Sequence, residues 1–338
     1  MDNLTHTLTA VALSQAGLSR KTRFATLTLV AAANLPDLDI ISRFWRSATY
    51  LEHHRGFTHS ILGVSLLALV LGEVVYLLGR KAKPKSGPPP SLLWLLLLAW
   101  IGTASHLLMD FTNSYGVRPF LPFSARWYAW DIMFIFDPVL LLVLCIGLGL
   151  PTLLRLVSEE VGARKSRPAW GAVFSLCALV FLWGVRDVAH RRVLGFLDSH
   201  TYSEQAPLQV GAFPSPVNPF EWTGVIETDT AYDVLPANAL DDDLDPHSGQ
   251  QFHKPDASAA LDAALKTRTG VIFMDFAKFP WAQTEENDEG FSVEIRDLRF
   301  YTNYGGRRFV AEIEMDKILR VRSESFSFSG PDHSAPVR

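Results

Sequence analysis

Residues 52–79, EHHRGFTHSILGVSLLALVLGEVVYLLG, place three histidines directly before a long apolar run. The run is long enough to cross a bilayer as a helix, which takes about 20 residues. His53, His54 and His59 therefore stand at the end of a predicted membrane helix. Ionisable side chains at membrane depth are costly and by default mark a functional site. The stretch predicts membrane helices with a polar site at one of their ends.

Apolar stretches recur along the first half of the 338-residue chain, whose hydrophobic fraction of 48% is high for a soluble protein. Four of them are expected to be long enough to cross a bilayer. Two shorter ones precede these and are rich in small residues that suit contacts between helices. The stretches are residues 60–79, 92–109, 132–150 and 170–185, preceded by 4–18 and 24–41. The sequence therefore predicts a polytopic α-helical membrane protein with about six helices.

Lysine and arginine are unevenly distributed between the loops that join these stretches. Alternate loops lie on one side of the membrane, and the side richer in basic residues is normally cytoplasmic. One set of loops holds Arg20, Lys21, Arg23, Arg80, Lys81, Lys83, Lys85, Arg155, Arg164, Lys165 and Arg167, and the other holds Arg43, Arg46, Arg55, Arg118 and Arg126. We therefore expect the histidine loop and the C-terminal part to face outward, although Arg191 and Arg192 on that side argue against it.

Ionisable side chains gather at the ends of the predicted helices, all on the side expected to face outward. They are His6, Asp37, Asp39, His53, His54, His59, His106, Asp110, Asp131 and Asp137. The topology rests on apolar length and basic loops alone, so this coincidence is independent of it. We expect the group to form one functional site.

Residue types and spacing in this group favour a transition-metal site. His106 and Asp110 are four residues apart and share a helix face. Imidazole together with carboxylate suits zinc, manganese or iron better than calcium. The candidate ligands are more than one tetrahedral zinc needs and fit a site with two or more ions of zinc, manganese or iron. They are His6, Asp37, Asp39, His53, His54, His59, His106 and Asp110. Such a site activates water for attack on a phosphoester, and the candidate catalytic residues are Asp39, His54 and Arg55.

Several of these residues also have a purely structural interpretation. His6 could pack at the membrane interface without binding metal, and Asp37 with Asp39 could form a cap or a turn. His53 or His54 could orient a neighbouring ligand or meet the substrate. Asp137 precedes Pro138, and a helix cap is the first interpretation there.

Four motifs resemble those of the YdjM-type membrane-bound metal-dependent hydrolases. They are NLTHTLTA, NLPDLD, HHRGFTHS and SHLLMDFTNSYG, at residues 3–10, 34–39, 53–60 and 105–116. The resemblance covers about residues 1–200, and HRGFTHS and HLLMDFTN are its most specific parts. It implies a membrane-embedded metal-dependent hydrolase.

A more distant similarity is to the zinc-dependent phospholipase C and single-strand nuclease superfamily. Those helical enzymes hold three metals with an N-terminal histidine, an aspartate, a further histidine and a His-x-x-x-Asp helix. The matching positions here are His6, Asp37 or Asp39, His53 or His54, and His106 with Asp110. Where those enzymes carry one more histidine, this sequence has Ser114, Tyr115 and Gly116. The resemblance therefore implies one or two ions here.

The character of the sequence changes after Phe196, where prolines are followed by strand-like segments with alternating hydrophobicity. The predicted strands are residues 223–235, 270–279, 291–301 and 307–316, with one helix over 256–268. The acidic segment 240–249 lacks the ligand spacing of an EF-hand and is expected to be a solvated loop. We predict a membrane domain over residues 1–190, a linker over 191–215 and a soluble α+β domain outside the membrane over 216–338.

Together these features predict a hydrolase embedded in a bacterial inner membrane, with its site and C-terminal domain on the outer side. The expected substrate is an amphiphilic phosphoester, lipid or lipid-linked, whose phosphate Arg55, Arg118 or Arg126 could bind. The alternative is a non-catalytic metal-binding membrane protein or a metal transporter. A transporter should carry ionisable groups through the middle of the bilayer, where only Glu73 is found. The small net charge of −4 gives no reason to expect a nucleic-acid partner.

Overall fold

The computed structural model describes residues 1–44, 47–82, 89–160, 169–301 and 309–327. The chain divides into two compact units. The helical unit comprises Met1–Asp39, Arg55–Val188 and Pro214–Pro219, and the sheet unit comprises Ile40–His54, Ala189–Phe213 and Phe220–Arg338. Several basic residues used to orient the chain lie outside the described residues, namely Arg46, Lys83, Lys85, Arg164, Lys165 and Arg167.

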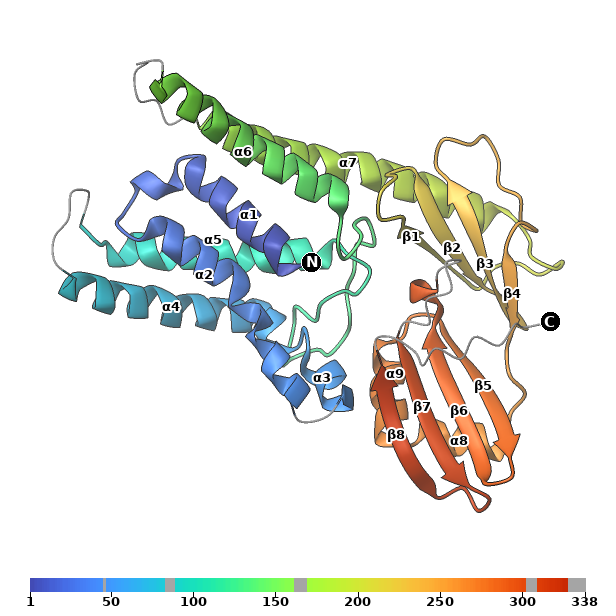
Figure 1. Ribbon diagram of the computed structural model, residues 1–338. Coiled ribbons are helices and arrows are strands. Elements are labelled where there is room, and N and C mark those ends of the chain that lie inside the picture. Colours follow the sequence, from blue (N-terminus) through green and yellow to red (C-terminus); the bar gives the residue numbers. More distant parts are fainter. Residues whose placement is uncertain (45–46, 83–88, 161–168, 302–308, 328–338) are drawn as a thin grey trace. The chain divides into compact units, whose positions relative to one another are not determined.

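Helices make up the first half of the chain (Figure 1). They are α1 (Asn3–Gln15), α2 (Ala25–Asn34), α3 (Ser47–His53), α4 (Ile61–Lys81), α5 (Leu92–Phe111), α6 (Pro138–Glu160) and α7 (Trp170–Ser199), with the 3₁₀ helices η1 (Leu18–Arg20), η2 (Pro36–Phe44) and η3 (Phe57–His59). Helix α4 begins with a side-chain cap, since the Ser60 hydroxyl accepts a hydrogen bond from Gly63 N at 2.9 Å. Pro36 ends α2 and turns the chain into η2, because proline cannot continue the helix.

The prediction of about six membrane spans is not supported. Among the described residues, three helices are long and apolar enough to cross a bilayer, namely α4, α5 and α7. Helices α1 and α2 have 13 and 10 residues, which is too short for about 30 Å of hydrocarbon at 1.5 Å per residue. Within α6, Pro138–Pro151 is a shorter apolar segment among the described residues, and residues 132–137 of the predicted span precede the helix.

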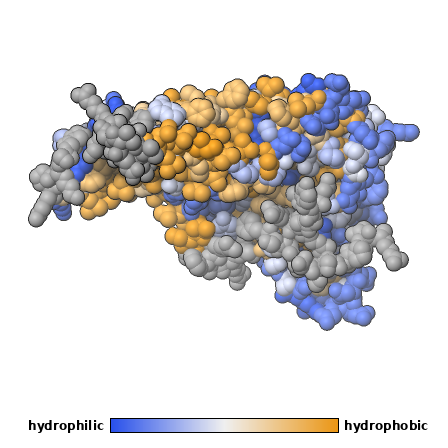
Figure 2. All heavy atoms as spheres, turned by 45° about the horizontal axis from the view of Figure 1, so that its top comes forward, coloured by the Kyte–Doolittle hydropathy of each residue, from blue (hydrophilic) through white to orange (hydrophobic). Residues whose placement is uncertain are grey.

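Apolar side chains cover the outer surface of the helical unit, as expected for contact with lipid. Figure 2 shows hydrophobic side chains gathered on its visible face, whereas the visible face of the sheet unit is mostly hydrophilic. On α4 the exposed side chains include Leu62, Leu66, Leu69, Val70, Val74, Leu77 and Leu78. The opposite face of α4 packs on α5 through small residues, as Ala68 and Ala99 do, which allows the two backbones to approach closely.

Gly102 brings α5 against α2, one turn before His106. A Cβ atom at Gly102 would lie 2.6 Å from Ala32 Cβ and 2.9 Å from the Leu29 carbonyl oxygen. Only glycine allows this approach, and the approach lets the ring of His106 reach the carbonyl of Ala33 at 2.7 Å.

Asp137 has the structural role that its position before Pro138 indicated. Its Oδ1 accepts a hydrogen bond from Leu140 N at 2.9 Å and so caps α6. Its Oδ2 lies 2.7 Å from the Arg186 guanidinium of α7, and both side chains are fully buried. This pair ties α6 to α7.

The sheet unit contains two four-stranded antiparallel sheets among the described residues. The first has the order β1 (Gln209–Pro214), β2 (Glu221–Glu227), β3 (Ala231–Asn238) and β4 (Gln250–His253), and the second β5 (Pro280–Asn287), β6 (Gly290–Asp297), β7 (Val310–Asp316) and β8 (Val321–Ser327). Each strand pairs with its neighbour in sequence, as in consecutive hairpins.

Two helices, α8 (Ala259–Leu265) and α9 (Arg268–Phe276), lie between the sheets in sequence. The strand predicted over residues 270–279 is wrong, because Gly270–Phe276 belongs to α9. Phe273 and Phe276 are three residues apart and both buried, a helical spacing hidden within an apolar run. The single helix predicted over 256–268 ends at Leu265, and the Thr267 hydroxyl then caps α9 by accepting from Gly270 N at 3.0 Å.

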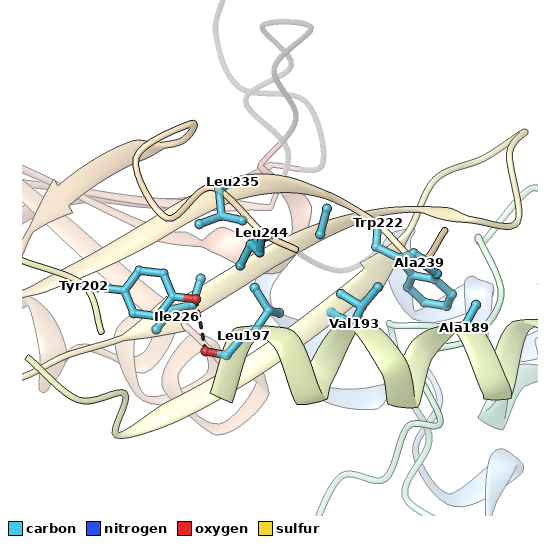
Figure 3. Close-up of a cluster of buried hydrophobic side chains, with 11 residues drawn as sticks. Ala189, Val193, Leu197, Tyr202, Trp222, Ile226, Leu235, Ala239 and Leu244 are labelled. Carbon is cyan, nitrogen blue, oxygen red and sulfur yellow. Dashed lines mark hydrogen bonds between the residues drawn. The ribbon is translucent and has the colours of Figure 1, made fainter. Parts of the chain in front are cut away.

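Helix α7 continues past the apolar segment into the core of the first sheet (Figure 3). Ala189, Val193 and Leu197 on one face of the helix pack with Trp222 and Ile226 of β2. The Tyr202 hydroxyl donates a hydrogen bond to the Leu197 carbonyl at 3.0 Å and closes the end of the helix. Of the predicted linker, residues 191–199 are therefore helical, and 209–214 form β1.

We predict that Gly102→Leu lowers the stability of the helical unit. The added side chain must displace α2, and overpacking of this kind costs about 1–3 kcal/mol. Thermal unfolding of detergent-purified protein should show a lower Tm. Gly184→Leu is the matched control, because no atom lies within 4 Å of a Cβ at Gly184. Equal Tm values for the two variants would contradict the close packing of α2 and α5.

Candidate metal centre

Four side chains of the helical unit converge at the end of α5. They are Asp37 of η2, His59 of η3, and His106 and Asp110 of α5, and each offers one ligand atom within 4.8 Å of the others. His106 and Asp110 lie one turn apart on the same helix face, as their spacing predicted. His59 follows Gly56 at the start of the long apolar run, so that run places it at the helix end.

The distances within this group match those around a tetrahedral ion. His59 Nε2 lies 3.4 Å from Asp37 Oδ1 and from Asp110 Oδ2, and His106 Nε2 lies 3.5 Å from each of the same oxygens. The two Nε2 atoms are 3.0 Å apart. Zinc bonds of about 2.0 Å in a tetrahedron give ligand–ligand edges of about 3.3 Å. Five of the six distances between the four atoms are therefore close to those expected around one zinc-sized ion, and all six are below 4.8 Å.

Burial makes a cation at this point favourable. His59, His106 and Asp110 are fully buried, and the Asp110 Oδ2 atom has no hydrogen-bond partner. Burial by itself raises the pKa of Asp37, but contacts with His106 and His59 outweigh it and hold that pKa well below its usual range. Two carboxylates with two imidazoles balance the charge of a divalent ion, which also satisfies the orphaned oxygen.

Two outer contacts aim the imidazoles at the centre. His106 Nδ1 lies 2.7 Å from the Ala33 carbonyl oxygen. Because a carbonyl can only accept, Nδ1 carries the proton and Nε2 presents its lone pair to the group. On the other ring, His59 Nδ1 lies 3.3 Å from Asp39 Oδ2. Contacts of this kind fix the ring orientation of metal-bound histidines and raise their basicity.

Arg55 contacts Asp110 of the group and Asp39 beside the group. Its guanidinium donates to Asp110 Oδ1 at 3.0 Å and to Asn113 Oδ1 at 2.8 Å, and its backbone N–H donates to Asp39 Oδ2 at 2.8 Å. Its φ of +52° lets the backbone and the side chain serve different partners. The Arg55 side chain is buried over the Tyr115 ring, so it is held in place rather than presented to solvent.

His6 completes the surroundings of Asp110. Its ring stacks on that of His106 with centroids 3.9 Å apart, and its Nε2 lies 3.4 Å from Asp110 Oδ1. The Met1 amino group contacts the same oxygen. Burial and the neighbouring His106 lower the pKa of His6 well below its usual value, so its ring is neutral and able to bind metal.

The structure brings together only part of the predicted ligand set. Asp37, His59, His106 and Asp110 form the group, whereas His6 and Asp39 lie beside it. His53 and His54 belong to α3 in the sheet unit and are not members of the group. The His53 ring is exposed with Nδ1 3.1 Å from the Thr49 carbonyl, and the His54 ring stacks on Tyr50 at 4.6 Å. The three histidines of residues 53–59 thus have different surroundings.

Some supporting groups could hardly be identified from the sequence. The Ala33 carbonyl is a backbone atom, and no residue type could have indicated it. Asn113 lies three residues after Asp110, and its side chain touches both that carboxylate and Arg55. Its place at the end of the SHLLMDFTN motif was the one available signal.

Comparison with known proteins places this architecture in a family. A family model described as "YdjM inner membrane protein" matches residues 1–191, which is more than half of the chain. The chain therefore belongs to the YdjM inner membrane protein family, and the predicted family is confirmed. Residues 1–191 contain all four members of the metal-ligand group.

Among curated proteins, the chain is similar to the uncharacterized protein YfhP of Bacillus subtilis, with 30% identity over 149 residues. The match covers 41% of this chain and 42% of that protein, so the chain spans less than half of the length of this relative. No solved structure matches the chain. The more distant resemblance to the zinc-dependent phospholipase C superfamily is not shown by these comparisons.

We predict that purified protein loaded with zinc and desalted retains about one ion per chain, as a single tetrahedral site requires. His59→Ala and His106→Ala should lose that ion, because each removes one of the four ligand atoms. His53→Ala is the matched control and should retain it. Metal content is measured by plasma mass spectrometry. Equal loss of zinc from the His53 and His59 variants would contradict the group described above.

Proposed function

We propose that this protein is a membrane-embedded, metal-dependent hydrolase of phosphoesters. The observation that carries the proposal is the buried group of Asp37, His59, His106 and Asp110, spaced as around one ion. A divalent ion held there supplies Lewis acidity, which activates water near neutral pH and polarises a phosphoryl oxygen. Zinc fits the donor set best, with manganese or iron as alternatives.

The protein's own residues would hold and shield this chemistry. Asp39 and the Ala33 carbonyl orient the two imidazoles, and Arg55 orients Asp110. Full burial of three ligands excludes bulk water, which strengthens every electrostatic interaction at the site. Asp37 retains 15% of its side-chain exposure, so its edge is where water or substrate would enter. Asp39, beside that edge, is the candidate proton acceptor.

Apolar side chains beside the ligands favour an amphiphilic substrate. Leu38, next to Asp37, is 54% exposed, and Phe57, two residues before His59, is 45% exposed. Leu4, two residues before His6, is also exposed. A lipid or lipid-linked phosphoester would contact such residues with its chains while its head group meets the metal. For the phosphate, Arg126 is the most exposed candidate, since Arg55 and Arg118 are buried over Tyr115 and Trp127.

The proposed location is the outer side of the bacterial inner membrane. The name of the family model supports the inner membrane, and α4, α5 and α7 are apolar enough to span it. Orientation rests on the excess of basic residues in the opposite loops. The group lies at the end of α5, since Asp110 is the penultimate residue of that helix. That position suits a substrate in the lipid head-group layer.

A metal transporter is the main alternative, and the site's position argues against it. A transporter needs ionisable groups along a path through the bilayer. In α4, the described span that carries an acidic residue in its middle, Glu73 is exposed on the helix surface rather than turned toward a pathway. A site at a helix end suits chemistry at the interface better than transport.

We expect zinc-loaded protein in mixed micelles to release phosphate or a phosphorylated head group from a lipid phosphoester. His106→Ala should lower the rate by about 100-fold or more, because even changes to groups that orient a ligand cost 10–100-fold. His53→Ala should leave the rate near that of the wild type. Product release is followed across phospholipids and water-soluble phosphoesters. Zinc binding without hydrolysis of any of them would favour the non-catalytic alternative.

A further inference from the structure

The chain leaves the helical unit between two groups of residues that surround the metal centre. The helical unit includes residues up to Asp39 and resumes at Arg55, whereas Ile40–His54 belongs to the sheet unit. Asp39 contacts His59, and Arg55 contacts Asp110. This excursion of the chain, residues 40–54, is therefore flanked on both sides by residues that position metal ligands.

Helix α3 anchors this excursion within the sheet unit. Leu51 is 2% exposed and Tyr50 is 8% exposed, and α3 packs against α9 and β8. The Arg268 guanidinium of α9 donates to Glu52 Oε2 at 2.8 Å. Helix α9 is in turn fixed to β8, because Thr269 N donates to Glu324 Oε2 at 3.0 Å. These contacts make α3 a part of the sheet unit.

A hydrogen bond from Arg55 N to Asp39 Oδ2 at 2.8 Å joins the residues on either side of the excursion. The same Oδ2 atom lies 3.3 Å from His59 Nδ1. The Arg55 guanidinium lies 3.0 Å from Asp110 Oδ1. Any change in how the two ends of the excursion meet is therefore passed directly to two of the four ligand residues.

We propose that docking of α3 on the sheet unit positions the metal centre, so that the sheet unit sets the metal affinity of the helical unit. This inference rests on the proposed metal centre. Without the anchor, metal binding must hold Asp39 and Arg55 in place at an entropic cost. With α3 docked, that cost is met during folding and the ligands are preorganised. Leu51, Glu52 and Arg268 are positioning residues in this sense.

The first test compares zinc dissociation constants of full-length variants by competition with a chelating dye. Leu51→Ala loosens α3 and should raise the zinc Kd by about tenfold or more, in the range seen when ligand-orienting groups are removed. Leu235→Ala is the matched control, because Leu235 is also buried in the sheet unit but lies in the core around α7. It should leave the zinc Kd unchanged. Equal Kd values for the wild type and both variants would overturn the inference.

A second test uses the exposed ion pair and does not create a cavity. Glu52→Arg places two cations together and should weaken zinc binding by about two- to fivefold, as expected for a surface pair. Adding Arg268→Glu restores the attraction with reversed signs and should restore the wild-type Kd. The cobalt-substituted protein reports ligand geometry, and its absorption spectrum should change and recover in the same order.

The outcomes separate this inference from the proposed function. Wild-type protein that binds no zinc overturns both. Wild-type protein that binds zinc, with a Kd insensitive to Leu51→Ala and to the Glu52–Arg268 exchange, overturns the positioning role alone. A raised Kd in Leu51→Ala, with restoration in the exchanged pair, supports the positioning role whether or not a phosphoester is hydrolysed.

Discussion

The arrangement of the helical unit depends on a carboxylate that has been removed from water. Asp110 is fully buried, and a buried charge is stable only when other groups replace its hydration. Arg55 and the Met1 amino group contact its Oδ1, while Oδ2 faces the two imidazoles. Side chains from α1, η3 and the segment between α3 and η3 therefore converge on this residue.

The same arrangement places the candidate metal-ligand group at the end of an apolar helix, α5. Small residues bring α2, α4 and α5 together, and this packing places the Ala33 carbonyl against His106. Apolar side chains on the outside of these helices contact lipid, so the polar groups are confined to the interior of the unit near one end. Apolar packing thus forms the scaffold, and the buried ionisable groups described at this end of α5 lie within it.

The chain passes between the helical unit and the sheet unit at several points. Helix α7 has an apolar segment in the helical unit, and its last turns supply Val193 and Leu197 to the core of the first sheet. Residues 40–54 cross in the opposite direction and dock as α3. An appended domain would need only one crossing. The chain therefore passes between the two units more than once.

The sequence by itself determined the features that depend on local pattern. The apolar runs of α4, α5 and α7, the shared face of His106 and Asp110, the Asp137 cap and the family were all predictable, because helical periodicity and motif spacing act over a few residues. Only the tertiary structure decided the number of spans, the helical state of residues 270–276, and which histidine of the 53–60 motif joins the metal group. His53, His54 and His59 are the same residue type within one short motif. His59 belongs to the helical unit, whereas His53 and His54 belong to the sheet unit. That membership follows from contacts between residues more than two hundred positions apart, such as Glu52 and Arg268, which no local pattern encodes.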